Sequence, residues 1–254
     1  MEIELAPPYQ DLTFMSPLSE DRAARLVRFL ADGLDGVVVD VGCGWAELLL
    51  RVVEAAPKAT GLGLDLDADA VGHGRRLAER RGLDQRVRLV VGNARDELPA
   101  RVDAAICIGA TQVWGEEGRT DLPIDYRSAL RALRSAVEPG GRVVYGEGVW
   151  SAEPTEAAAA PLAGRLDEFV RLPELLDLAV AEGFRPVQVH EATLDEWDEF
   201  ESGYSACYAR WLATHPADHP HADEVRRRAD RQRAAYLRGY RGVLGLAYLG
   251  LLAV

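Results

Sequence analysis

Short, continuously apolar runs alternate with amphipathic segments over the first three quarters of the chain. Apolar runs of this length, bounded by glycine, proline or charged residues, are typical of buried strands. They lie at residues 37–41, 60–66, 87–91, 102–108, 142–146 and 186–191. The segments between them have helical periodicity and end near glycine or proline. These predicted helices lie at residues 20–30, 46–56, 69–81, 128–137 and 173–181.

The alternation of apolar runs and amphipathic segments ends after the sixth apolar run. Residues 195–238 have helical character apart from the polar interruption THPADHPHAD, and residues 244–253 read as a last strand. Apolar strands separated by helices predict an α/β, doubly wound, mostly parallel sheet that is covered on both faces. A long helical segment before a final strand predicts a helical cap inserted into the domain rather than a second domain.

We therefore expect a single domain over residues 1–254. Its parts are an N-terminal helical segment (1–30), a ligand-binding core (31–194), a helical cap insertion (195–240) and a terminal strand (241–254).

Composition excludes several classes of protein. The 254 residues are 48% hydrophobic and 28% charged, which is ordinary for a globular domain, and the net charge of −12 argues against nucleic acid as a partner. No apolar run approaches the roughly 18 residues of a membrane span, and the acidic, proline-containing N-terminus does not resemble a signal peptide. Cys43, Cys107 and Cys207 form no disulfide or metal pattern. We expect a cytoplasmic protein without a membrane partner.

The stretch from residue 37 to residue 47, VVVDVGCGWAE, carries the most chemical information. A buried strand runs into a turn containing Gly42 and Gly44, and a helix follows whose free amide groups can hold a polar or anionic group. Asp65 stands at the end of the next strand, where a carboxylate can accept both hydroxyls of a ribose. The alternative is a purely structural glycine turn beside a solvated Asp65.

The identity of the ligand depends on the residues around the turn. A dinucleotide site would read G-x-G-x-x-G/A from Gly42, but the sixth position is Glu47, whose carboxylate would oppose a pyrophosphate. S-adenosylmethionine has a ribose, no phosphate and a cationic end, which suits Asp40 and Glu47 better. A nicotinamide-dependent oxidoreductase remains the less favoured alternative.

Several motifs resemble those of the class I S-adenosylmethionine-dependent methyltransferases. The segment Asp40-Val-Gly-Cys-Gly-Trp-Ala46 resembles the family's D-x-G-x-G-x-G motif, with Ala46 in place of the third glycine. The segments Gly63–Asp67, Gly92-Asn93-Ala94 and Val102–Ala110 are similar to the ends of the family's second, third and fourth strands, with Asn93 in place of the usual aspartate. The resemblance implies a Rossmann-like seven-stranded sheet whose last strand is antiparallel.

By this resemblance, one group of residues binds the cofactor S-adenosyl-L-methionine. Its members are Asp40, Gly42, Cys43, Gly44, Asp65, Leu66, Asn93, Ala94, Ile108 and Gly109. The implied reaction is in-line methyl transfer to a small molecule, in which the protein aligns the reactants and excludes water. A base is needed only if the nucleophile carries a proton. A protein that binds the cofactor without methyl transfer, or uses it in another reaction, is the main alternative.

Three side chains are candidates for catalysis. Glu147 follows the fifth strand and can act as a base or bind a substrate cation, or it can be a hydrogen-bonded loop acid. His190 lies in the sixth strand, where a structural histidine is the favoured interpretation. Tyr204 belongs to an aromatic stripe at helical spacing, which more often packs on a core than covers a substrate. The stripe comprises Trp197, Phe200, Tyr204, Tyr208 and Trp211.

Five residues are candidates for contact with the substrate. Thr111, Gln112 and Trp114 follow the fourth strand, Trp150 follows the fifth, and Tyr208 belongs to the aromatic stripe. The loop that holds His215, Asp218, His219 and His221 lacks helical ligand spacing and predicts a solvated turn, so we expect no metal site. The substrate, the methylated atom and the oligomeric state, a homo-oligomer included, stay open.

Overall fold

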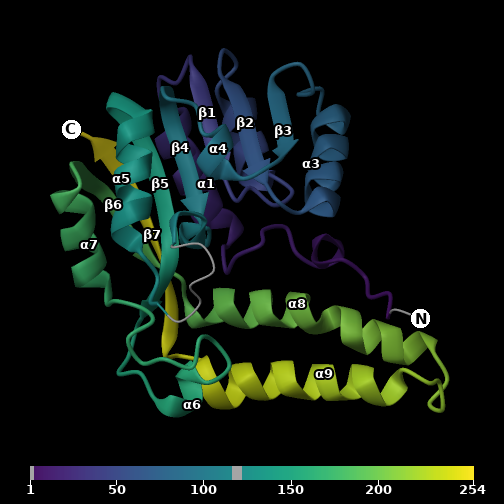
Figure 1. Cartoon of the computed structure of the whole chain (residues 1–254). Coiled ribbons are helices and arrows are strands. Elements are labelled where there is room, and N and C mark those ends of the chain that lie inside the picture. The colour runs from purple at the N-terminus through teal and green to yellow at the C-terminus, as the bar shows by residue number, and fades with distance from the viewer. Residues whose placement is uncertain (1–2, 116–121) are drawn as a thin grey trace.

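A seven-stranded sheet with helices on both faces forms the centre of the molecule (Figure 1). The computed structural model describes residues 3–115 and 122–254. The strand order is β3-β2-β1-β4-β5-β7-β6, in which β7 is antiparallel to both of its neighbours and the other pairs are parallel. This confirms the expected α/β, Rossmann-like sheet with an antiparallel last strand. The strands are β1 (Val37–Val41), β2 (Thr60–Asp65), β3 (Val87–Val91), β4 (Val102–Ile108), β5 (Val137–Trp150), β6 (Phe184–Glu191) and β7 (Leu244–Ala253).

The fifth strand is much longer than the pattern predicts. Its register against β4 shifts between Val102 and Ala104, so that residues 138–141 bulge out of the pairing. At its other end it stays paired with β7 as far as Trp150 opposite Leu244. The predicted end of this strand at residue 146 was wrong. Pairing with β7, which lies far along the chain, extends the strand through the glycine-containing segment to Trp150.

Helices cover the sheet and form an arm beside it. The longer ones agree with the predicted ranges, whereas those of only three or four residues were missed because so short a segment shows no helical period. The helices are η1 (Pro8–Gln10), α1 (Glu20–Ala31), α2 (Glu47–Ala55), α3 (Ala68–Arg80), α4 (Ala94–Glu97), η2 (Thr111–Trp114), α5 (Tyr126–Ala136), α6 (Glu156–Ala159), α7 (Leu172–Ala181), α8 (Leu194–Thr214), α9 (Ala222–Ala235) and η3 (Tyr236–Tyr240).

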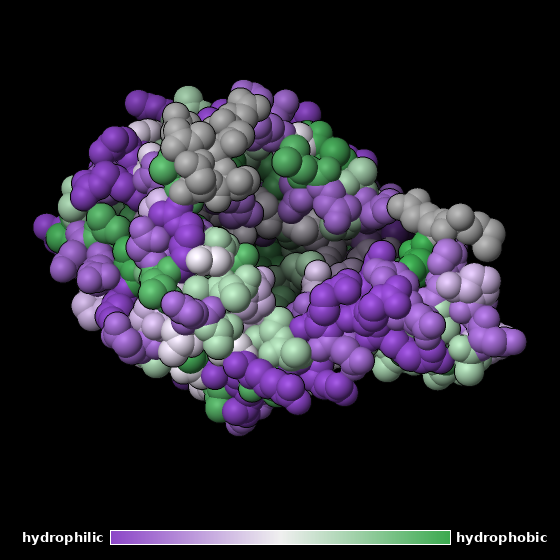
Figure 2. Space-filling model, turned by 60° about the horizontal axis from the view of Figure 1, so that its bottom comes forward, coloured by the Kyte–Doolittle hydropathy of each residue, from purple (hydrophilic) through white to green (hydrophobic). Residues whose placement is uncertain are grey.

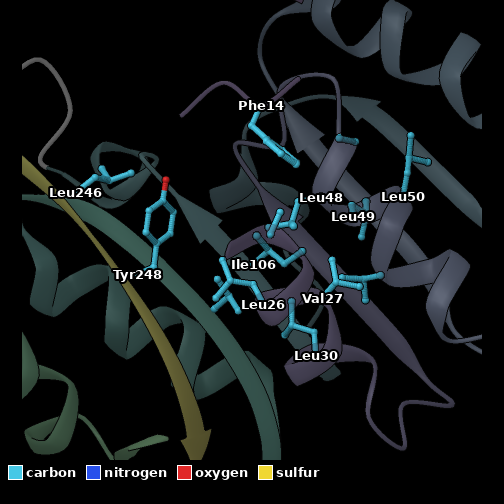
Figure 3. Packing of buried hydrophobic residues seen from close by; sticks show 14 of the residues in the cluster. Phe14, Leu26, Val27, Leu30, Leu48, Leu49, Leu50, Ile106, Leu246 and Tyr248 are labelled. Carbon is cyan, nitrogen blue, oxygen red and sulfur yellow. The ribbon is translucent and has the colours of Figure 1, made fainter. Parts of the chain in front are cut away.

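Two apolar clusters fix the sheet from either side. One cluster packs α1 and α2 on β4 and β7 and includes Leu26, Leu30, Leu49 and Ile106, which Figure 3 shows meeting in one place. The cluster on the other face packs α5 and α7 against the sheet. Each fully buried side chain of this size contributes about 1.5–3 kcal/mol. The strand ends that carry polar residues are therefore held by a rigid support.

The helices α8 and α9 form an antiparallel pair that lies below the sheet in Figure 1, with the N-terminal segment running between them and the sheet. The side chain of Thr193 caps α8, and Glu196 three residues later completes a capping box. The Glu196 carboxylate also forms a two-pronged ion pair with Arg22 of α1, at 2.9 Å from Nε and 2.8 Å from Nη2. These hydrogen bonds outweigh the effect of burial and lower the pKa of Glu196 to about 2. The arm is thus tied to the sheet-covering helix α1.

The predicted division into core and cap stays a prediction. Within residues 3–115 and 122–254, no helix has the length and apolar character that crossing a bilayer requires.

Candidate functional site

A cavity of about 930 Å³ opens where β1, β2, β3 and β4 end. Figure 2 shows it as a hollow with apolar side chains inside it. Parallel strands bring their carboxyl ends to one edge of a sheet, which is where open α/β sheets bind ligands. All ten residues predicted to bind a cofactor line this cavity. The structure thus brings together residues that are spread over 70 positions of the chain.

The glycine turn after β1 allows a close approach of the backbone. Gly42 has φ of +68°, and a Cβ atom there would lie 2.4 Å from Cβ of Ala110. Gly44 also has a positive φ, +53°, but the space beside it is open. Ala46, which replaces the family's third glycine, adopts φ of +61° at the start of α2. An alanine in this left-handed conformation costs about 1 kcal/mol of backbone strain. Because this cost is small, the turn keeps its shape despite the substitution.

Asp65 connects the end of β2 to the glycine turn. Its Oδ2 accepts a hydrogen bond from the Gly44 amide at 2.7 Å, and its Oδ1 accepts one from the Asp67 amide at 2.9 Å. Each oxygen keeps a lone pair for another donor. Beside it, Leu66 is 71% exposed while lining the cavity. A carboxylate next to an open apolar side chain fits a ribose that carries a flat base.

Asp40 is the buried acid near the end of β1, just before the turn. It is 5% exposed, and burial followed by the charge of Asp65 raises its pKa well above the usual range. A cationic ligand would relieve both effects. Burial also raises the pKa of the neighbouring Cys43 thiol, which keeps it protonated rather than nucleophilic.

The structure corrects the expectation that Glu47 attracts a cation or repels a pyrophosphate, because two arginines pair with its carboxylate. Its Oε1 lies 2.7 Å from Nε of Arg51, and its Oε2 lies 2.6 Å from Nη2 of Arg81. Because two guanidinium groups compensate this carboxylate, Glu47 holds α2 against α3. Preference for a cationic ligand then depends on Asp40.

The ends of β3 and β4 complete this part of the cavity. Oδ1 of Asn93 accepts a hydrogen bond from the Arg95 backbone amide at 3.0 Å and so caps α4. The side-chain nitrogen of Asn93 can then donate to a ligand. Gly109 has φ of +63°, and Gln112 donates from Nε2 to its carbonyl at 3.3 Å. Gln112 also lines the cavity, as expected for a substrate-binding candidate.

Glu147 lies in a buried polar network beneath the β4 loop. Its Oε2 accepts a hydrogen bond from the Thr111 amide at 3.1 Å, and its Oε1 accepts one from the amide of the neighbouring Gly148 at 2.8 Å. The hydroxyl groups of Thr111 and Tyr145 lie 2.6 Å apart in the same network. Burial raises the pKa of Glu147 despite these hydrogen bonds. Among the described residues neither Glu147 nor Thr111 lines the cavity, so both are placed to hold the loop that does.

The remaining candidates are not among the described residues that line the cavity. Trp150 is 4% exposed and Trp114 packs with the cluster around α5. His190 lies in the outer strand β6 opposite Tyr248. Tyr204 is 36% exposed and Tyr208 packs near Trp211 in α8. Their proposed roles stay predictions.

Sequence reasoning missed two walls of the cavity. Residues 7–18 form one, held by the hydrogen bond from Nε1 of Trp45 to the Thr13 carbonyl at 2.8 Å. The other includes Ile124 and Glu168, which meet through an amide-to-carbonyl bond of 3.4 Å. The aromatic residues Tyr9 and Phe14 were a usable signal for the first wall, whereas no sequence pattern marks the second.

Within the described ranges, no group of three or more His, Cys, Asp or Glu side chains could hold a metal ion. The geometry of the cavity suits an adenosyl ligand, because the glycine turn, the free carboxylate lone pairs of Asp65, the open face of Leu66 and the uncompensated Asp40 each match one part of it.

Comparisons with known proteins agree with this geometry. Residues 38–141 match the family model of the methyltransferase domain. The chain is 27% identical over 241 residues to the uncharacterized protein YjhP of Escherichia coli (strain K12), a match that covers 94% of this chain and 93% of that protein.

Two solved structures are similar over nearly the whole chain. They are S-adenosylmethionine-dependent methyltransferases from Geobacter sulfurreducens and Thiobacillus denitrificans, each in complex with S-adenosyl-L-homocysteine. Their identities are 26% and 27% and their TM-scores 0.82 and 0.81, and both matches cover 97% of this chain and 96% of the other.

Proposed function

We propose that this chain, a class I S-adenosylmethionine-dependent methyltransferase, transfers the methyl group of S-adenosyl-L-methionine to a nucleophile on a small molecule by direct in-line displacement. The observation that carries the proposal is the extent of the cavity. It holds all ten predicted cofactor residues and continues past them to Phe14, Val113 and Ile124. At about 930 Å³ it is near the upper end of the roughly 300–1,000 Å³ usual for ligand sites, which leaves room for a second molecule.

The residues at the ends of β1, β2 and β3 would hold the cofactor. Asp65 would accept the ribose hydroxyls, Leu66 would cover one face of the adenine, and the Asn93 amide would contact its edge. Asp40 would face the cationic end. When bound, the cofactor supplies a methyl group made electrophilic by its sulfonium.

Alignment and the exclusion of water are the protein's main contributions in this proposal. The loop of Gly109 and Gln112 follows β4, between the cofactor half and the apolar half of the cavity, and would orient both molecules. Glu147 would act by holding that loop through the Thr111 amide rather than by removing a proton. We propose no metal ion in the reaction.

Isothermal titration of the whole chain with S-adenosylmethionine, S-adenosylhomocysteine and NAD tests the cofactor. We expect the two adenosyl compounds to bind and NAD not to bind. Incubation with small-molecule extracts and labelled S-adenosylmethionine then tests turnover, read as S-adenosylhomocysteine release together with a product 14 mass units heavier. Preferential NAD binding would refute the proposal, and cofactor binding without any methylated product would favour a binding protein.

A further inference from the structure

Glu168 lines the cavity and lies outside the strand ends that carry the proposed cofactor residues. It lies in the irregular segment 166–170, next to the loop before α5, where its carbonyl accepts the Ile124 amide at 3.4 Å. The proposed cofactor residues follow β1, β2, β3 and β4, so we assign Glu168 to the part of the cavity that these strand ends leave for a methyl acceptor. Apolar side chains from outside the cofactor set also line the cavity, among them Phe14, Leu18 and Val113.

The segment that carries Glu168 is fixed by Trp150. The Trp150 amide donates to the Val170 carbonyl at 3.0 Å, and its indole Nε1 donates to the Leu166 carbonyl at 2.9 Å. Phe169 packs edge-on against the indole ring, with 5.0 Å between ring centroids, and fills the space beside Gly148, where a Cβ atom would lie 2.6 Å from its ring. Both ends of the segment are therefore tied to β5, so Glu168 is held in place before a ligand arrives.

The carboxylate of Glu168 is incompletely satisfied. Its Oε2 is shielded from solvent and has no hydrogen-bond partner among the described residues. Burial raises its pKa, as expected of a carboxylate that has lost water without gaining a donor. The last torsion of a glutamate side chain is broad, so either oxygen can turn towards the cavity.

The charges around the cavity favour a cation in this place. Of the described lining residues seven are Asp or Glu, against the single cation Arg95. The Arg95 guanidinium already donates to the Val113 carbonyl at 2.5 Å and to that of Gly115, which leaves it poorly placed to bind an anion.

Asp125, which also lines the cavity, already has hydrogen-bond partners. Asp125 caps α5, accepting the amide of Ser128 at 3.0 Å and its hydroxyl at 2.6 Å. Among the described residues, Glu168 is thus the lining carboxylate that has an oxygen without a hydrogen-bond partner.

We propose that Glu168 selects the methyl acceptor by binding a protonated amine joined to an apolar body, so that the enzyme prefers small organic cations to carboxylates. The ammonium group is the part that is recognised, and another atom of the acceptor, one with a lone pair, attacks the methyl group. The inference rests on the proposed methyl transfer and specifies the acceptor that the same cavity takes. The ammonium group donates to the Glu168 carboxylate, and the apolar body lies against the side chains that line this half.

The test uses three probes with the same apolar body: 2-phenylethylamine, 2-phenylethanol and phenylacetate. Each is titrated calorimetrically into the whole chain saturated with S-adenosylhomocysteine. A charge-assisted hydrogen bond predicts that the amine binds roughly 10- to 100-fold more tightly than the carboxylate, with the alcohol between them.

Three variants locate the source of this preference. Glu168→Gln should abolish the preference for the amine, whereas Glu168→Asp, which keeps the charge, should retain most of it. Asp84→Asn removes the same charge from an exposed residue that does not line the cavity, and should behave like the wild type.

The outcomes distinguish a failure of the role of Glu168 from a failure of the proposed methyl transfer. Equal or tighter binding of phenylacetate, absence of amine binding, or an unchanged preference in Glu168→Gln would overturn the role of Glu168. The affinity for S-adenosylhomocysteine is measured first in every variant, and equal values show that the protein is folded. If the wild type fails to bind S-adenosylhomocysteine at all, the proposed function fails rather than the assignment of Glu168.

Discussion

Replacing Asp65 by alanine tests the arrangement on which the cofactor half of the cavity depends. The substitution removes the acceptor of the Gly44 amide at 2.7 Å and of the Asp67 amide at 2.9 Å, together with the lone pairs available to a ribose. Hydrogen bonds to a charged group contribute about 1.5–3 kcal/mol each, but Asp65 is half-buried and water replaces part of the loss. We therefore expect Asp65→Ala to weaken S-adenosylhomocysteine binding by about 1–3 kcal/mol, which is about 5- to 150-fold.

Calorimetric titration of the folded variant measures this change, with urea denaturation alongside it. Asp65→Asn should lose a similar amount of affinity, because its amide group presents a donor to one of the two backbone amides that need an acceptor. Asp84→Asn removes the same charge from an exposed residue outside the cavity and serves as the control. If Asp65→Ala binds S-adenosylhomocysteine within two-fold of the wild type, Asp65 contacts no ribose and only shapes the turn.

Three further substitutions probe the turn, the arm and the buried network. Gly42→Ala should cost at least about 2 kcal/mol of stability and more affinity than Gly44→Ala, which meets open space and costs only about 1 kcal/mol of backbone strain; the reverse ranking in calorimetry and denaturation would contradict the clash. Glu196 has a folded pKa of about 2, below its unfolded value, so its contribution is complete above about pH 4.5 and declines as the pH falls towards 2. The difference in unfolding free energy between the wild type and Glu196→Gln should therefore shrink over that window in urea denaturation, and a constant difference would exclude this linkage. Glu147→Ala leaves the buried Thr111 amide without an acceptor and should lower the unfolding free energy by at least about 1–3 kcal/mol; an unchanged denaturation midpoint would argue against the network.

The gathering of the ten proposed cofactor residues at one cavity could be predicted because its determinants are local. A buried strand, a glycine turn and a helix occupy consecutive residues, and Asp65 ends the next strand of a parallel sheet, so their meeting follows from topology. Even the departure at Ala46 could be interpreted from the sequence, since the turn keeps its left-handed conformation there.

The direction of side chains at the end of β5 could not be predicted. Glu147 and Trp150 were expected to open onto the cavity because the strand was expected to end at residue 146. Pairing with β7 instead keeps both residues inside the sheet, and alternation along the strand sends them to opposite faces. Trp150 faces the segment of Glu168, whereas Glu147 faces the network of Thr111. A long-range pairing thus decided the surroundings of two candidate residues.

The same distinction explains why the acceptor half of the cavity escapes sequence reasoning. Its walls come from the N-terminal segment, from the loop before α5 and from the segment of Glu168, none of which has a periodic pattern. They are placed by contacts such as the hydrogen bonds from Trp45 to Thr13 and from Trp150 to Leu166, between residues that are distant in the chain. Under the proposed function, changes in these segments would therefore alter the acceptor and leave the glycine turn and Asp65, the proposed cofactor residues, unchanged. If this separation holds, Glu168→Gln changes the choice of acceptor and leaves cofactor affinity intact, whereas Asp65→Ala lowers cofactor affinity.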